Sequence, residues 1–195
     1  MTDLSALLRR RSVPAQFLIE PGPSPAQVDT AIDAALRAPD HGRLQPWRYR
    51  LVRGAARQML AERLVQATLA RDPAAPAAQL QKLRARSTVP LTIVISAQLK
   101  DHPNVPQVEQ LLSAGAGIMN LLNAFDAQGF GAILLTGPNV YDPAVGRLLG
   151  LQAGEQLLGF VHVGTVADGA PRPGPRPDRA SFVHEWHCTA TGSAA

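Results

Sequence analysis

Residues 37–47 read Arg-Ala-Pro-Asp-His-Gly-Arg-Leu-Gln-Pro-Trp and separate a predicted helix from a predicted strand. Pro39 disfavours helical geometry at Ala38, so we expect the helix to end there. The following Asp and Gly are typical turn residues, and the charge of His41 can change near neutral pH. The plain interpretation is a surface turn anchored by Trp47. Other parts of the chain favour a functional loop.

Apolar periodicity predicts the remaining elements. Helices are expected over 4–9, 25–37, 55–69, 77–85, 108–128 and 142–149. Strands are expected over 47–53, 90–96, 131–135 and 156–163, of which 90–96 is nearly all apolar and predicts a buried central strand. Prolines predict an extended arm over 13–25. We expect a flexible linker at about 71–88 and a C-terminal arm over about 165–195.

The predicted strand over 47–53 alternates apolar and basic residues, which indicates one buried face. Its arginines are Arg48, Arg50 and Arg53. They could contact nucleic acid, but aromatic residues do not interleave on the same face. We therefore expect a solvated strand face.

Composition indicates one domain spanning 1–195 and excludes several classes of protein. The chain of 195 residues is 46% hydrophobic, yet has no apolar run of about 18 residues, so no membrane span is expected. The beginning of the chain does not resemble a signal peptide, and the lone Cys188 fits a reducing cytoplasm. The net charge of +4 is spread along the chain, which argues against a nucleic-acid module.

Several catalytic motifs are missing from the sequence. It contains no Gly-x-Ser-x-Gly elbow, no Walker loop and no His-Glu-x-x-His. His184, His187 and Cys188 are close in sequence, but two of them are adjacent and a fourth ligand is not evident, so we predict no metal site. Phe182 to Trp186 is expected to dock on a surface, which could belong to a second subunit.

Arg9-Arg10-Arg11-Ser12 follows the first predicted helix. Cations at a helix C-terminus can simply complement the helix dipole. Alternatively, guanidinium forks and a hydroxyl donor form a phosphate clamp. The residues alone leave both interpretations open.

The predicted helix over 108–128 is apolar on most of its faces. Such a helix is usually buried, and burial on several sides in a short chain suggests a subunit partner. Gly115 and Gly117 would allow another backbone to approach closely.

Several motifs together resemble the nitroreductase-like FMN flavoproteins, and within them a small subgroup of NAD(P)H nitroreductases. The resemblance extends from Leu7 to Trp186. The motifs, in order, are Arg10-Arg11-Ser12, Arg37-Ala38-Pro39-Asp40-His41, Gln45-Pro46-Trp47, Glu109-Gln110 with Ser113-Ala114-Gly115, Gln128-Gly129-Phe130-Gly131, and Gly159-Phe160 to Gly164.

The resemblance implies an α+β fold with a central mixed, mainly antiparallel sheet flanked by helices, in an intertwined homodimer. FMN would lie at the subunit interface. One subunit would supply Arg10, Arg11 and Ser12, and the other Arg37, Pro39 and His41. Leu134, Leu135 and Thr136 match a third flavin-contacting stretch. NAD(P)H would reduce the flavin, which then reduces a nitro-type or related small acceptor. Because the flavin carries the hydride chemistry, a catalytic side chain is not required.

Two departures from the family pattern bear on function. Many relatives carry a basic residue shortly after the Arg-Ser pair, whereas Val13 to Gln16 has none. Arg43, Arg37 or His41 would then supply positive charge near the flavin pyrimidine. Leu134-Leu135 replaces a Trp-Arg pair, which leaves open an alternative function as a flavin-binding or flavin-sequestering protein with little turnover.

Overall fold

The computed structural model describes residues 5–172 and 174–187. Its sheet has the strand order β1-β5-β3-β2, with β4 also paired to β5. The strands are β1 (Leu18–Ile19), β2 (Trp47–Val52), β3 (Leu91–Gln98), β4 (Gly131–Leu135) and β5 (Glu155–Val166). All strand pairs are antiparallel, and one isolated bridge between Ser12 and Ala132 is parallel. The predicted mixed, mainly antiparallel sheet is confirmed.

The α-helices lie where apolar periodicity predicts them. They are α1 (Ser5–Arg9), α2 (Pro25–Ala35), α3 (Ala55–Arg71), α4 (Ala77–Ala85), α5 (Gln107–Ala127) and α6 (Pro143–Leu148). Short 3-10 turns are η1 (Ala15–Phe17), η2 (His41–Arg43), η3 (Arg86–Thr88), η4 (Pro138–Val140) and η5 (Arg179–Ser181). Local chemistry explains the helix starts: Ser24 forms a capping box with Gln27, and Asp142 caps α6 by accepting from Ala144 N.

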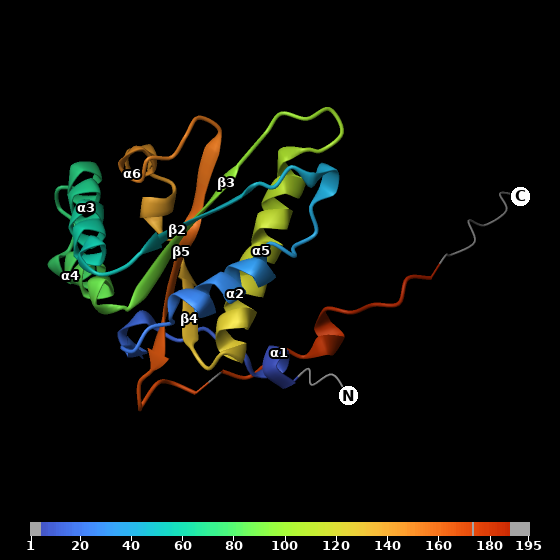
Figure 1. Ribbon diagram of the computed structural model, residues 1–195, viewed down its shortest axis with the longest axis horizontal. Helices are drawn as coiled ribbons and strands as arrows, with labels where there is room; N and C mark the ends of the chain where they lie inside the picture. Colours follow the sequence, from blue (N-terminus) through green and yellow to red (C-terminus); the bar gives the residue numbers. More distant parts are fainter. Residues whose placement is uncertain (1–4, 173, 188–195) are drawn as a thin grey trace, which may run out of the picture.

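The helices cover both faces of the sheet, and Figure 1 shows α2 and α5 on one side with α3, α4 and α6 on the other. Alternate residues of β3 explain this arrangement. Ile93 and Ile95 pack in the cluster formed with α2 and α5, whereas Val94 packs in the cluster that includes Leu64 of α3 and Val145 of α6. Every residue of β3 before Gln98 is buried, so the prediction of a central strand is confirmed.

Two segments are more ordered than the sequence predicts. The expected surface arm over 13–25 contains η1 and β1, and Val13 and Leu18 are buried with Val89. That part of the prediction is wrong, because two apolar side chains anchor the segment to the sheet. Residues 71–88, expected as a flexible linker apart from the predicted helix over 77–85, contain α4 and also η3, and Leu83 of α4 is buried.

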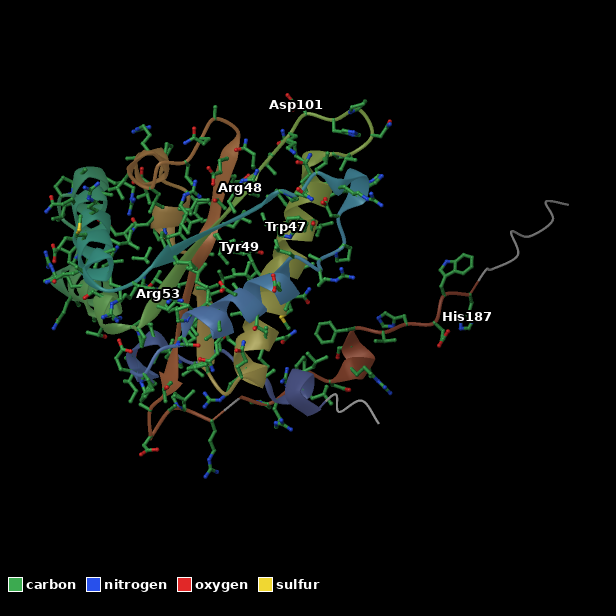
Figure 2. All side chains as sticks on the ribbon, in the orientation of Figure 1. Trp47, Arg48, Tyr49, Arg53, Asp101 and His187 are labelled. Carbon is green, nitrogen blue, oxygen red and sulfur yellow. The ribbon has the colours of Figure 1, made fainter. Side chains whose placement is uncertain are left out.

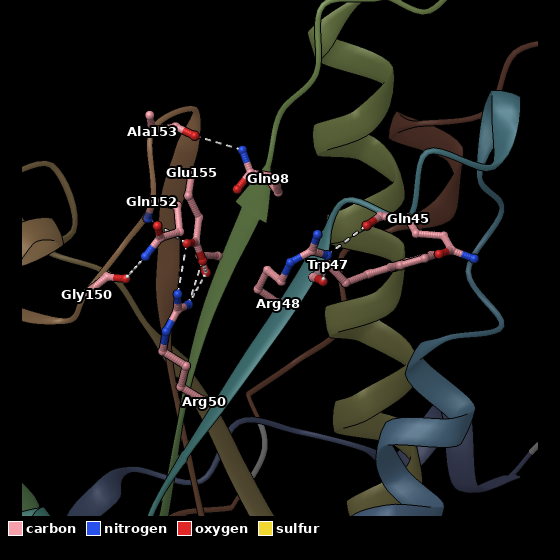
Figure 3. Close-up of polar contacts among 10 residues, drawn as sticks. Gln45, Trp47, Arg48, Arg50, Gln98, Gly150, Gln152, Ala153 and Glu155 are labelled. Atoms are coloured by element: carbon pink, nitrogen blue, oxygen red, sulfur yellow. Dashed lines mark hydrogen bonds and ion pairs between the residues drawn. The ribbon is translucent and has the colours of Figure 1, made fainter.

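The expectation of a solvated arginine face on β2 is wrong for Arg50. Its guanidinium donates to both carboxylate oxygens of Glu155, at 2.6 and 2.8 Å (Figure 3). Arg48 is exposed and donates to the backbone carbonyls of Gln45 and Trp47. β2 therefore carries one solvated arginine and one that ties it to β5.

The C-terminal segment extends away from the rest of the chain in Figure 1. Phe182, Val183 and Trp186 are all exposed, Trp186 by 84%, so they dock on nothing within the described chain. No described helix is long and apolar enough to cross a membrane. The described residues contain no cluster of three possible metal ligands, and Cys188 lies outside them.

Candidate functional site

Arg10, Arg11 and Ser12 lie at the beginning of β4. Ser12 bridges to Ala132, and the N–H of Val13 donates to the carbonyl of Ala132 at 3.1 Å. Thr136 follows the other end of this strand. Four extended residues span about 13 Å, so the Arg-Arg-Ser motif and Leu134 to Thr136, the third predicted flavin contact, lie along one edge strand.

The Arg10 guanidinium has unsatisfied donors. Its Nε and Nη1 atoms are buried and lack a hydrogen-bond partner among the described residues. Leaving charged donors buried and unpaired is costly. A phosphate group carries several acceptor oxygens and would supply charge-assisted hydrogen bonds to such donors. The residues present therefore fit the phosphate of FMN.

Sequence reasoning missed the contribution of the C-terminal arm to this site. Arg172 and Arg176 line a pocket of about 390 Å³ together with Arg10, Arg11 and Ser12. Arg176 also donates to the carbonyls of Leu8 and Arg10, which ties the arm to α1. The sequence feature that could have predicted this contribution is the concentration of arginines in the proline-rich stretch over 168–179.

The second predicted group, Arg37, Pro39 and His41, is exposed at the end of α2 and in η2. Two positions in this loop have left-handed backbone without being glycine, Arg43 (φ 52°) and Gln45 (φ 50°). Such conformations cost of order 1 kcal/mol or more each and occur often at functional sites.

Polar contacts hold this strained loop in place. The Asp40 carboxylate accepts from the N–H groups of Leu44 (3.2 Å) and Gln45 (2.8 Å). The Lys100 ammonium donates to the carbonyl of Leu44 at 2.8 Å. His41 Nδ1 lies 2.7 Å from Glu109 Oε2 in the first turn of α5. These contacts place His41 at the N-terminal end of that helix.

One chain does not bring the two predicted groups together. His41 contacts Glu109 near the start of α5, whereas Ser12 bridges Ala132 just beyond its end. The intervening helix is about 27 Å long, at roughly 1.5 Å per residue. His41 and Ser12 of the same chain therefore lie at opposite ends of α5.

The third predicted stretch lies where β4 ends. Leu134 and Leu135 are half-buried, and Thr136 is exposed. Leu134 approaches the backbone of Gly159 so closely that a Cβ there would lie 2.7 Å from Leu134 Cδ1. The glycine in β5 thus makes room for Leu134, and the stretch forms an apolar wall beside an exposed hydroxyl.

The aromatic side chains of Trp47 and Tyr49, both on β2, point toward α5. Figure 2 shows Trp47 and Tyr49 on β2. A Cβ added at Gly117 of α5 would lie 2.9 Å from both Trp47 Nε1 and Tyr49 Oη. Burial raises the pKa of the Tyr49 hydroxyl to about 12. Trp47 therefore packs against α5 and anchors the end of the loop.

His162 is a polar side chain within the sheet, on β5. It is buried in β5, and Nδ1 lies 2.9 Å from Thr92 Oγ1. Nε2 is buried and has no hydrogen-bond partner among the described residues. Burial, and secondarily the charge of Arg86, lower the pKa of His162 to about 4, so the ring is neutral near pH 7.

The chain belongs to the nitroreductase family, whose sequence profile matches residues 7–165. It is 34% identical over 186 residues to an Escherichia coli (strain K12) protein named "Putative NAD(P)H nitroreductase YdjA", covering 94% of this chain and 98% of that protein. A nitroreductase-like protein from Bacillus cereus has the same fold, with a TM-score of 0.81 at 21% identity over 95% of this chain and 97% of that one.

A further solved structure is described as a putative nitroreductase from Desulfovibrio desulfuricans in complex with FMN. It superposes with a TM-score of 0.73 at 20% identity, covering 96% of this chain and 98% of that one. The predicted nitroreductase-like fold is confirmed.

Proposed function

We propose that this protein is an FMN-dependent NAD(P)H oxidoreductase that reduces a nitro-type or related small acceptor. Membership of the nitroreductase family supports this function. The observation that carries the cofactor assignment is the Arg10 guanidinium, whose two buried donors lack partners beside a pocket of about 390 Å³. The lone cysteine in the sequence fits the proposed cytoplasmic location.

The chain's own residues bind and orient the cofactor. Arg10, Arg11 and Ser12 hold the phosphate through charge-assisted hydrogen bonds. Leu134 and Leu135 form an apolar wall at the other end of the site, and Thr136 supplies an exposed polar group there. When bound, FMN supplies the hydride-transfer chemistry, so these residues need only bind and exclude water.

The proposed homodimer completes the site with Arg37, Pro39 and His41 of the partner subunit. α5 exposes Val108, Leu112 and Met119 by 59%, 68% and 45%. With Gly115, where an added Cβ would meet nothing within 4 Å, they share one face of the helix. Two α5 helices packed antiparallel on this face would bring the His41 end of one beside the Ser12 end of the other.

The C-terminal segment supports the same assembly. Phe182, Val183 and Trp186 are exposed, and they belong to the C-terminal segment that extends away from the rest of the chain (Figure 1). Exposed aromatic residues of this kind mark a protein contact. We infer that the arm crosses the partner subunit, as an intertwined homodimer requires.

An FMN titration of Arg10→Ala tests the phosphate site. Loss of a charged hydrogen-bond donor should weaken FMN binding about 10- to 100-fold while the dimer persists. Arg63→Ala is the matched control, because Arg63 is exposed on α3 and outside the site. Unchanged FMN affinity in Arg10→Ala would contradict the assignment. Bound flavin that NAD(P)H does not reduce would support the alternative of a flavin-sequestering protein.

A further inference from the structure

A second cationic pocket opens beside the third flavin-contacting stretch. It has a volume of about 470 Å³, and α4 forms one wall of it. Thr136 and Gly137, directly after β4, also line it. In the proposed function the flavin lies beside Thr136, so this pocket adjoins the flavin. A molecule that binds against the flavin can therefore reach the pocket.

The pocket carries more positive charge than its surroundings neutralise. Its lining includes Arg71, Lys82 and Arg86 and no carboxylate. Arg71 is already paired, with its guanidinium 2.6 Å from Asp142 Oδ2. Among the described residues, the side chains of Lys82 and Arg86 have no ion-pair partner within 4.0 Å.

Lys82 and Arg86 are four residues apart at the end of α4, so they project from the same side of the helix. Arg86 is half-buried, and burial lowers its pKa. A desolvated cation without a partner is stabilised when an anion binds. A volume of 470 Å³ is in the usual range for small-molecule sites.

We propose that this pocket binds a phosphate group of the nicotinamide dinucleotide, with Lys82 and Arg86 as the phosphate-binding residues. The inference rests on the proposed function. The dinucleotide must place its nicotinamide against the flavin, and its phosphates then lie to one side of that contact. Both the pyrophosphate and the 2′-phosphate of NADPH share the chemistry that two cations recognise.

The test is calorimetric titration of the FMN-loaded protein with NADP⁺ and with NAD⁺. Lys82→Ala is the first variant, because Lys82 is exposed and its loss should not affect folding. The matched control is Arg84→Ala on the same helix. Arg84 pairs with Glu62 at 2.8 Å and does not line the pocket.

Lys82→Ala should weaken dinucleotide binding about tenfold, and Arg84→Ala should not change it. Weakening of both dinucleotides identifies the pyrophosphate as the bound group, and weakening of NADP⁺ alone identifies the 2′-phosphate. Unchanged binding in Lys82→Ala, or absence of binding by the unaltered protein, would overturn the inference. Flavin content is measured in the same samples, so a protein that holds no flavin would instead count against the proposed function.

Discussion

His41 Nδ1 lies 2.7 Å from Glu109 Oε2, and this contact fastens the η2 loop to the first turn of α5. The two side chains are 59% and 42% exposed, so the pair adds little to folding stability. Its consequence is positional, because it sets the direction in which the His41 ring faces.

Replacing the acid of this pair should affect the cofactor more than the fold. Glu109→Gln should raise the dissociation constant of FMN about three- to tenfold, or roughly 1 kcal/mol, because His41 is no longer held. The free energy of unfolding should change by less than about 1 kcal/mol. Fluorescence titration and chemical denaturation measure the two quantities. Asp126→Asn, at the far end of α5, is the control, and an equal effect of both variants would contradict the role of Glu109.

The exposed face of α5 should determine assembly. Leu112→Glu places a charge in the proposed interface, where burying it is strongly unfavourable, so the variant should be monomeric. It should also lose flavin, because the site needs both subunits. Light scattering and absorbance measure these outcomes. Met59→Glu is the matched control, since Met59 is 58% exposed on α3; a dimeric Leu112→Glu protein would exclude this face as the interface.

Gly117 should tolerate no side chain. A Cβ there would lie 2.8 Å from Trp47 Cδ1 and 2.9 Å from Tyr49 Oη, so Gly117→Ala should destabilise the fold by about 1–3 kcal/mol through overpacking. Tyr49→Phe removes a buried hydroxyl that has no hydrogen-bond partner in the described part of the chain, and this change should be nearly neutral. The cost of Gly117→Ala should fall in the Tyr49→Phe background. Additive effects in denaturant unfolding would show that the hydroxyl does not limit the space.

Acid stability should depend on the Arg50–Glu155 pair shown in Figure 3. Burial by itself raises the pKa of Glu155, but hydrogen bonds from Arg50 and Ser96 outweigh it and lower the pKa to about 2. As the pH falls from about 4.5 toward 2, Glu155 therefore binds a proton in the unfolded chain before it does so in the folded chain. The stabilisation from the Arg50–Glu155 pair is complete above this pH range and is lost within it.

Glu155→Gln tests this pH dependence. The variant should be less stable at pH 7 by about 3 kcal/mol, because Arg50 loses its charged partner. Its stability should vary less between pH 4.5 and 2 than that of the unaltered protein. Denaturant unfolding across this range measures both effects, and parallel curves for the two proteins would show that Glu155 titrates normally.

Local patterns in the sequence predicted most of the fold. Ser24-Pro25 marks the start of α2 because capping and a fixed proline φ act within one turn. β3 was predicted because both of its faces are apolar. The role of Arg50 was not predictable in this way, since its partner Glu155 is distant in sequence. The sequence did not predict β1, because a strand of two residues is too short to show an apolar alternation. The burial of Leu18 in the structure reveals this strand.

The sequence predicted the motifs of the candidate site one by one. It did not predict how these motifs come together in the fold. Arg10 and Ser12 were recognised by resemblance, but the contribution of Arg176 depends on the path of a proline-rich arm. His41 and Glu109 both lie in motifs that carry the family resemblance, yet their contact depends on how the η2 loop folds against α5. Contacts between distant segments follow from tertiary packing, which residue spacing does not encode.

The most direct test of the central claim is a visible absorbance spectrum of the purified protein before and after anaerobic addition of NADPH or NADH. We expect an oxidised flavin spectrum that bleaches when the nicotinamide is added. A protein that is colourless and does not take up added FMN would contradict the cofactor assignment and the oxidoreductase function built on it.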